Sequence, residues 1–100
     1  MEVSASMFYL LLVLTEPIHG YQIMKRVEEV SAGSVKMGAG TCYGLIARCQ
    51  KEHLIKLSKD DGKKKTYLIT ELGQQLLDNE IASMKKQIDH AENYWGNKHD

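Results

Sequence analysis

The sequence predicts an α+β fold that is mainly helical and carries one small β-hairpin. Apolar residues recur with a helical period in four stretches, and between the third and fourth the period changes to the alternation of a strand. The last stretch keeps an a/d spacing for almost three heptads, which predicts a long C-terminal dimerisation helix. With 100 residues the chain is long enough for one modest core.

Charge is divided unevenly along the chain, although the formal net charge is zero. Residues 1–70 contain ten Lys/Arg and seven Asp/Glu, whereas residues 71–100 contain three and six. A neutral total therefore hides a basic part and an acidic part. The longest apolar run, residues 7–14, falls far short of the roughly 20 residues that span a bilayer, and its flanks do not resemble a signal peptide. We expect a cytoplasmic protein without a membrane partner.

The first helical stretch, residues 3–15, is apolar nearly all round. A helix of this kind is buried on most sides. Because so small a domain cannot cover every side, we expect a second copy of the chain to cover one flank. Pro17 then ends the helical pattern and turns the chain.

A second amphipathic helix is predicted from Tyr21 to about Val30. Its charged residues share the outer face, and its inward residues are expected to be Tyr21, Met24, Val27 and Val30. The run Ser-Ala-Gly-Ser at residues 31–34 ends it.

The third helical stretch, within residues 38–54, has two unlike faces. The apolar stripe is formed by Cys42, Leu45, Ile46 and Cys49. The opposite face is small and then basic, and a slender helix start with free amide groups suits entry into a DNA major groove. An ordinary solvated face is the alternative. The residues predicted to approach DNA from this helix are Ala39, Gly40, Thr41, Gly44, Arg48 and Lys51.

Two alternating stretches, residues 55–58 and 65–69, flank a turn that begins at Asp60 and predict a β-hairpin. Lys63, Lys64 and Lys65 surround its tip. After a DNA-reading helix such a hairpin is typical of a wing that grips the phosphate backbone, and a solvated lysine cluster is the alternative. The chain thus predicts a winged helix-turn-helix.

Thr70 is a good N-cap for the last helix, which we expect to run to about Tyr94. Its seam has an a/d spacing and predicts pairing in a homodimer, with packing against its own domain as the alternative. The seam residues are Leu77, Ile81, Met84, Ile88, Ala91 and Trp95. We accordingly divide the chain into a DNA-binding domain, residues 1–69, and a dimerisation helix with its tail, residues 70–100.

An effector site is a further expectation. Near the end of the pairing helix, Tyr94 and Trp95 would lie opposite Met7, Phe8 and Leu11 of the first helix in a symmetric dimer. Such an aromatic cavity would suit a planar or hydrophobic compound. The alternative is that Trp95 only covers the end of the dimer seam and binds no ligand.

Other site chemistries find little support. Cys42 and Cys49 lie about 10 Å apart along a helix, beyond disulfide reach, and are interpreted as small buried hydrophobes. A metal or redox site that adds His53 is the alternative, without a supporting spacing. We predict no cofactor and no metal, and no enzyme, because no nucleophile with a base and no phosphate loop is present.

Three motifs resemble those of PadR-type transcriptional regulators in their short-tailed form. They are His-Gly-Tyr-Gln-Ile at 19–23, Gly-Thr-Cys-Tyr at 40–43 with Arg48 following, and Tyr-Leu-Ile-Thr-Glu-Leu-Gly at 67–73. The resemblance implies a dimeric repressor that releases its operator when a small phenolic or hydrophobic molecule binds. It also implies that Tyr43 donates its hydroxyl to the DNA backbone, with a ring that closes the core as the alternative.

The sequence departs from this pattern at two kinds of position. The cysteines stand where leucines are common, and His53 replaces the usual glycine, so the third helix is expected to end differently. Arg26 and Arg48 are the only arginines, which leaves few candidates for bidentate guanine readout. A winged-helix protein-interaction module without specific DNA binding is therefore the second functional hypothesis.

Overall fold

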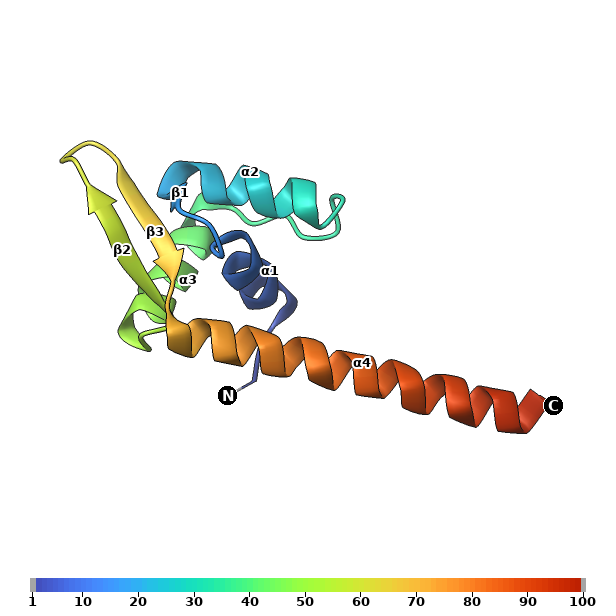
Figure 1. Cartoon of the computed structure of the whole chain (residues 1–100). Helices are drawn as coiled ribbons and strands as arrows, with labels where there is room; N and C mark the ends of the chain where they lie inside the picture. Colours follow the sequence, from blue (N-terminus) through green and yellow to red (C-terminus); the bar gives the residue numbers. More distant parts are fainter. Residues whose placement is uncertain (1, 100) are drawn as a thin grey trace.

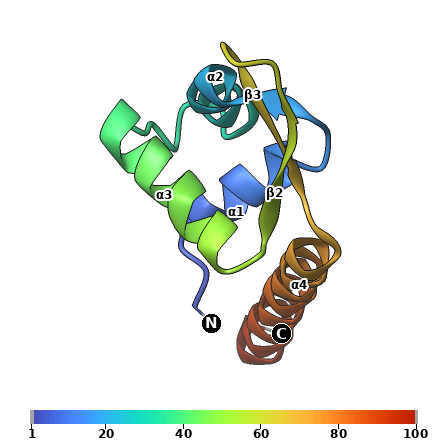
Figure 2. The same ribbon diagram turned by 90° about the vertical axis from the view of Figure 1, so that its left-hand side faces the viewer.

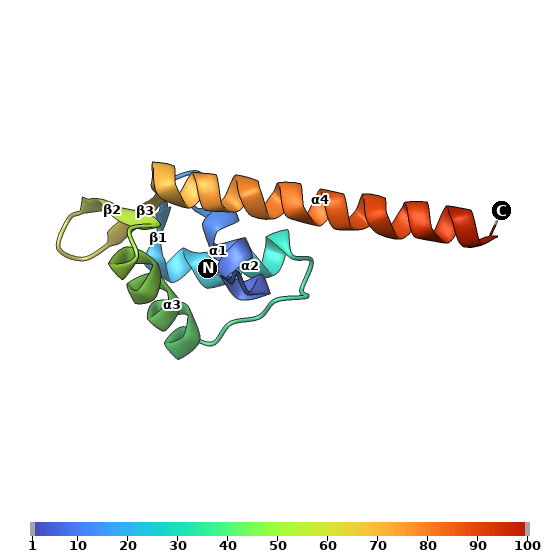
Figure 3. The ribbon, with the colours of Figure 1, turned by 90° about the horizontal axis from the view of Figure 1, so that it is seen from below.

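The computed structural model describes residues 2–99 and confirms the predicted α+β fold (Figure 1). The elements, in chain order, are α1 (Ala5–Val13), β1 (Ile18–His19), α2 (Gly20–Val30), α3 (Ala39–Lys51), β2 (Ile55–Asp60), β3 (Lys65–Ile69) and α4 (Glu71–His99). The first three helices and the sheet form one body, and the C-terminal half of α4 extends away from it (Figures 1 and 3).

The core is built around α1 and its C-cap residue, Leu14. Leu10, Leu11 and Leu14 have no exposed surface, and Met7 is 1% exposed. Burial of each such side chain contributes about 1.5–3 kcal/mol. Ser4 caps the helix, because its hydroxyl accepts a hydrogen bond from the amide of Met7 at 3.2 Å. The prediction that α1 is buried on most sides is confirmed.

The sheet contains one strand at a place where the sequence pattern predicts only a turn. Ile18 pairs with Tyr67 and His19 with Thr66, so β1 joins β3 on the side opposite β2 and the order is β1-β3-β2, all antiparallel. Nδ1 of His19 lies 2.9 Å from the hydroxyl of Thr66 and fixes this pairing. Two residues are too few for an alternating pattern, which is why periodicity does not reveal β1.

The hairpin differs from the prediction in one strand. Alternation places Leu57 on the inward face with Ile55, but Leu57 is 41% exposed. Beyond Ile55, β2 carries no buried residue, whereas β3 buries Tyr67 and Ile69. A bulge between Leu57 and Lys59 shifts the register, so the outer part of β2 is a solvated edge.

The buried stripe of α2 agrees with the predicted one at Val27, but near the start of the helix it is shifted by one residue. Gly20, Ile23 and Val27 are buried, whereas Tyr21 is 51% and Val30 is 47% exposed. The helix begins at Gly20, where the chain leaves β1, and this start sets the phase. Tyr21 is therefore a surface residue, not a core residue.

The end of α3 corrects the expectation for His53. The residue has φ +62°, so it adopts the left-handed conformation although it is not glycine. The amide of Leu54 donates to the carbonyl of Cys49 at 2.8 Å, and the amide of His53 donates to that of Gln50 at 3.0 Å. This is a Schellman ending. Helix α2 ends in the same way, with Ala32 at φ +52°.

Helix α4 begins as predicted, with Thr70 as its cap: the hydroxyl accepts a hydrogen bond from the amide of Gly73 at 3.0 Å. At Gly73 a Cβ would collide with the carbonyl oxygen of Leu54, so α4 passes directly over the start of β2. Leu77 is consequently buried in its own domain at 2% exposure. It packs there instead of lying on an open seam.

Candidate nucleic-acid interface

One face of α3 is open to solvent, and it carries the predicted DNA-contacting residues. The opposite face buries Cys42, Ile46 and Cys49, which confirms the apolar stripe. Near the start of the helix, a side chain placed at Gly40 or Gly44 would meet nothing within 4 Å. The first turns therefore present a smooth exposed backbone. All the predicted residues of this helix are exposed: Ala39, Gly40, Thr41, Tyr43, Gly44, Arg48 and Lys51.

The basic residues of α3 lie toward its C-terminal end. The side chain of Arg48 is 55% exposed, and its Nε lies 3.6 Å from Oε1 of Glu52, one turn further along. Lys51 is exposed in the last turn. A cation here is favoured by the helix dipole. The small and the basic parts of the predicted interface therefore occupy opposite ends of one helix.

The hairpin and α3 lie at the same end of the molecule, opposite the free end of α4 (Figures 1 and 3). Seen from that end, they stand on either side of the start of α2 (Figure 2). The three elements enclose a groove of about 260 Å³, lined by Gly20, Tyr21, Tyr43, Gly62, Lys63, Lys64, Lys65 and Tyr67. The fold thus brings Tyr43 together with the three predicted lysines.

Sequence reasoning missed the α2 and β1 side of this groove. The rings of His19 and Tyr21 stack in parallel with 5.7 Å between centroids, and Nζ of Lys64 lies 5.6 Å from the centroid of the Tyr21 ring. A cation over an aromatic face is attracted by the ring quadrupole. These contacts link the wing to the start of α2. The His-Gly-Tyr motif is the available signal, although its turn-like composition hides this role.

Gly20 allows two aromatic rings to approach the start of α2. A Cβ at this position would lie 3.2 Å from a ring carbon of Tyr67 and 3.6 Å from one of Tyr43. Tyr67 is 7% exposed, whereas Tyr43 is 47% exposed. The Tyr43 ring thus contacts the domain on one side and keeps an open side, which combines both sequence interpretations of this residue.

The wing tip is held by its own carboxylates. Oδ1 of Asp61 accepts hydrogen bonds from the amides of Lys64 at 2.7 Å and Lys63 at 3.1 Å, and Oδ1 of Asp60 accepts from Gly62 at 2.9 Å. The hydrogen bonds from the backbone amides of Lys64 and Lys63 lower the pKa of the Asp61 carboxyl. Because these acids bind backbone amides, they order the tip.

The cysteines lie in the core as free thiols. Burial, followed by the charge of Glu52, raises the pKa of Cys49 to about 11, and burial also raises the pKa of Cys42. A thiol in this state is a poor nucleophile and a poor metal ligand. His53 lies outside this buried stripe, on the surface.

The predicted effector residues lie apart within one chain, and the expected cavity, which needs a symmetric dimer, stays a prediction. Met7 and Leu11 are buried in the core, so they do not line an open cavity. Phe8 lines a groove between α1 and α4. Tyr94 and Trp95 are each 65% exposed and lie near the C-terminal end of α4.

The seam of α4 changes character along its length. Leu77 is buried, and Ile81 and Met84 are partly buried. Ile88 and Trp95, further along, are 56% and 65% exposed, and Ala91 between them is also exposed. The first half of the seam therefore packs on its own domain, and the second half lies open. None of the helices described in residues 2–99 is long and apolar enough to cross a membrane.

Comparisons with known proteins agree with this architecture. Residues 10–79 match the family model described as the transcriptional regulator PadR-like family. The Escherichia coli transcriptional regulator YqjI is 32% identical over 60 residues, which cover 60% of this chain and 29% of YqjI. The chain spans less than a third of the length of three curated relatives, YqjI among them.

Solved structures share the fold. A PadR-like regulator from Bacillus cereus is 27% identical with a TM-score of 0.68 and covers 88% of each chain. The Bacillus subtilis PadR structure in complex with operator DNA is 22% identical with a TM-score of 0.64 and covers 74% of this chain and 45% of that one. The family is one of transcription regulators, not of enzymes. The chain belongs to the PadR-like family of transcriptional regulators.

Proposed function

We propose that this DNA-binding regulator acts as a cytoplasmic homodimeric repressor and that the groove between α2, α3 and the wing holds the DNA backbone. The groove carries the proposal, because it combines three lysines with exposed tyrosine rings beside an open helix face. Lysines that neutralise phosphates release counterions and supply affinity without sequence information. The Bacillus subtilis PadR solved with operator DNA supports this use of the fold.

In this proposal the two ends of α3 have different roles. Ala39, Gly40, Thr41 and Gly44 allow close approach to the floor of the major groove, while Arg48 and Lys51 lie along its rim. Tyr43 donates its hydroxyl to the backbone. With few arginines, the protein reads base edges sparingly, so its specificity is modest and depends on the spacing of two half-sites.

Dimerisation would use the open half of α4. Ile88, Ala91 and Trp95 form an exposed apolar stripe that a second copy can cover. The groove at Phe8 and Met84 lies between α1 and α4, on the flank where a partner would add its own helix. We place a small aromatic or hydrophobic effector against Tyr94 and Trp95 in this assembly, where binding would release the operator.

Fluorescence anisotropy tests the proposal. A duplex from upstream of the protein's own gene is compared with a scrambled duplex while salt is raised. Tighter binding of the native duplex that persists near physiological salt supports a specific repressor. Equal binding of the two duplexes that disappears as salt is raised contradicts the proposal. This result favours the protein-interaction module, which is also consistent with the neutral net charge of the chain.

A further inference from the structure

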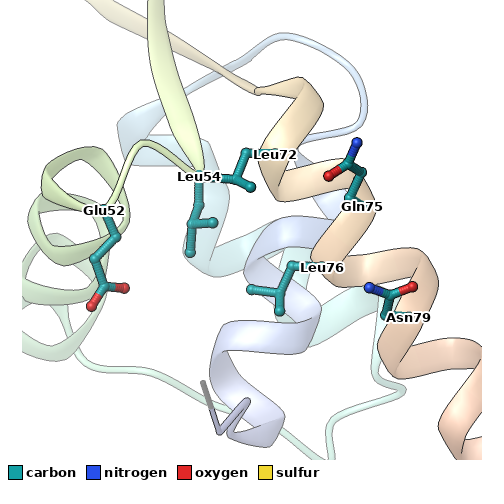
Figure 4. A pocket seen from close by; sticks show the side chains of 6 residues that line it. All are labelled: Glu52, Leu54, Leu72, Gln75, Leu76 and Asn79. Carbon is teal, nitrogen blue, oxygen red and sulfur yellow. The ribbon is translucent and has the colours of Figure 1, made fainter.

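A small apolar pocket lies where the end of α3 and the start of β2 meet the first turns of α4 (Figure 4). Its volume is about 260 Å³, and its lining residues are Glu52, Leu54, Leu72, Gln75, Leu76 and Asn79. It shares no residue with the groove between α2, α3 and the wing, nor with the aromatic end of α4. The proposed DNA and effector sites therefore leave it unused.

Three leucines form the apolar wall. Leu72 and Leu76 lie one turn apart on α4, and both point toward Leu54 (Figure 4). Leu54 is 3% exposed, Leu76 is partly buried, and Leu72 is 52% exposed. A leucine exposed to this extent at a pocket mouth offers apolar surface that a ligand can cover.

The polar side of the pocket is a carboxylate with one unused oxygen. Oε1 of Glu52 lies 3.6 Å from Nε of Arg48, whereas Oε2 is buried and has no hydrogen-bond partner among the described residues. A buried acceptor without a donor is unfavourable. The side chain as a whole is 33% exposed, so rotation about its last bond can turn this oxygen toward a ligand.

We propose that this pocket binds a small amphipathic amine, whose ammonium donates to the Glu52 carboxylate while its apolar body packs on the three leucines. A negative group beside an apolar wall selects a positive group on an apolar body. The side-chain amides of Gln75 and Asn79, on the α4 side, can bind a further polar substituent (Figure 4). The volume fits a single ring or a short alkyl chain, and drug-sized compounds need a larger pocket.

The ligand would contact both the end of α3 and the start of α4. Because it binds the folded protein at this junction, it would raise the melting temperature as its concentration increases. The proposal does not depend on DNA binding, since the experiment uses the full chain without DNA.

The experiment titrates ¹⁵N-labelled protein with 2-phenylethylamine and follows amide chemical shifts. We expect saturable shifts at Leu54, Leu72 and Leu76. The neutral 2-phenylethanol and the anionic 3-phenylpropionate should bind at least tenfold more weakly. Glu52→Gln should lower amine affinity about tenfold or more, because the ammonium then meets a neutral amide oxygen and the charge assistance of the hydrogen bond is lost. The matched control Glu29→Gln changes an exposed glutamate on α2 and should leave affinity unchanged.

Leu72→Ser gives a second variant whose fold is secure, because the residue is exposed; it should weaken amine and alcohol alike. Absence of shifts at the pocket overturns the proposal. Equal affinity of the amine for the wild type and Glu52→Gln overturns the role of the carboxylate. If Leu72→Ser leaves amine binding unchanged but lowers the sedimentation mass, the leucine surface belongs to a second copy and the proposal fails.

Discussion

The hydroxyl of Thr70 donates a hydrogen bond to the backbone carbonyl of His53, with 2.6 Å between the two oxygens. The same hydroxyl accepts from the amide of Gly73 at 3.0 Å. One side chain therefore caps α4 and ties it to the left-handed ending of α3. The backbone amide of Thr70 adds a third bond, to the carbonyl of Leu54 at 3.0 Å. This junction fixes the direction of α4 relative to the proposed DNA-reading helix.

Thr70→Val should lower the free energy of unfolding by about 1–2 kcal/mol, because it removes both hydroxyl bonds while it keeps the shape of the side chain. Thr70→Ser is the matched control, since its hydroxyl can still cap the helix, and it should lose only a few tenths of a kcal/mol. Chemical denaturation of the three proteins measures the difference. Equal stabilities for Ser and Val would show that the hydroxyl bonds contribute nothing.

Gly73→Ala should destabilise the fold by about 2 kcal/mol or more, because a Cβ would collide with the Leu54 carbonyl and with the Ile69 side chain at 2.8 Å. Gly96→Ala lies in the same helix with nothing within 4 Å and should raise stability by up to about 1 kcal/mol through helix propensity. Thermal melts of both variants compare the two effects. A tolerated Gly73→Ala would mean that α4 does not pass so close to β2.

His53→Gly should raise the free energy of unfolding by about 1 kcal/mol, because glycine adopts φ +62° without the strain of a side chain. His90→Gly makes the same exchange at an exposed position inside α4, where it should cost about 0.5–1 kcal/mol. Urea denaturation gives both values. A loss of stability on His53→Gly would reveal a stabilising contact of the imidazole.

Alkaline pH should destabilise the protein through Cys49. Its folded-state pKa of about 11 lies above the ordinary value of 9.0, so the native state keeps a proton that the unfolded state releases. The contribution is complete below about pH 9 and is lost as pH rises toward 11. It amounts to roughly 2 kcal/mol. Cys49→Ala should remove this part of the pH dependence of the free energy of unfolding. Parallel stability curves for the two proteins between pH 9 and 11 would contradict the assignment.

Patterns that repeat along the chain predict the fold well, whereas features that depend on a single pairing escape them. The stripe at Cys42, Ile46 and Cys49 has several members and places α3 correctly. Strand β1 has two residues, so only its partner, β3, defines it. The phase of α2 fails for a related reason, because Gly20 starts the helix and turns Tyr21 outward.

The candidate site is also only partly predictable, because some of its residues belong to local patterns and others are brought in by the fold. Local composition alone marks the wing lysines and the open face of α3. Tyr21 joins the site only because the fold places its ring beside both His19 and Lys64. Residue preference predicts a different helix ending at His53, yet hydrogen bonding holds this histidine in the conformation that glycine usually occupies. At such positions the backbone conformation is determined by the hydrogen bonds of the helix ending as well as by residue preference.

The wing lysines provide the decisive test of the DNA interface. Lys63→Ala with Lys64→Ala should weaken binding to native and scrambled duplexes by similar factors, because phosphate contacts carry no sequence information. If each lysine neutralises one phosphate, the slope of log K against log salt should become shallower by about 0.9 per contact. Lys65 is left intact because it pairs with Asp60 in the sheet.

The control for this pair is Lys85→Ala with Lys86→Ala, two exposed lysines of α4 whose loss changes the net charge equally. It should leave the salt slope unchanged. Anisotropy titrations at several salt concentrations distinguish the two pairs. If both double variants reduce DNA affinity equally, the electrostatic attraction depends on the total charge of the protein, and the groove does not contribute specifically. If the wing variant instead loses affinity only for the native duplex, the wing recognises sequence. The wing would then take the role proposed for α3.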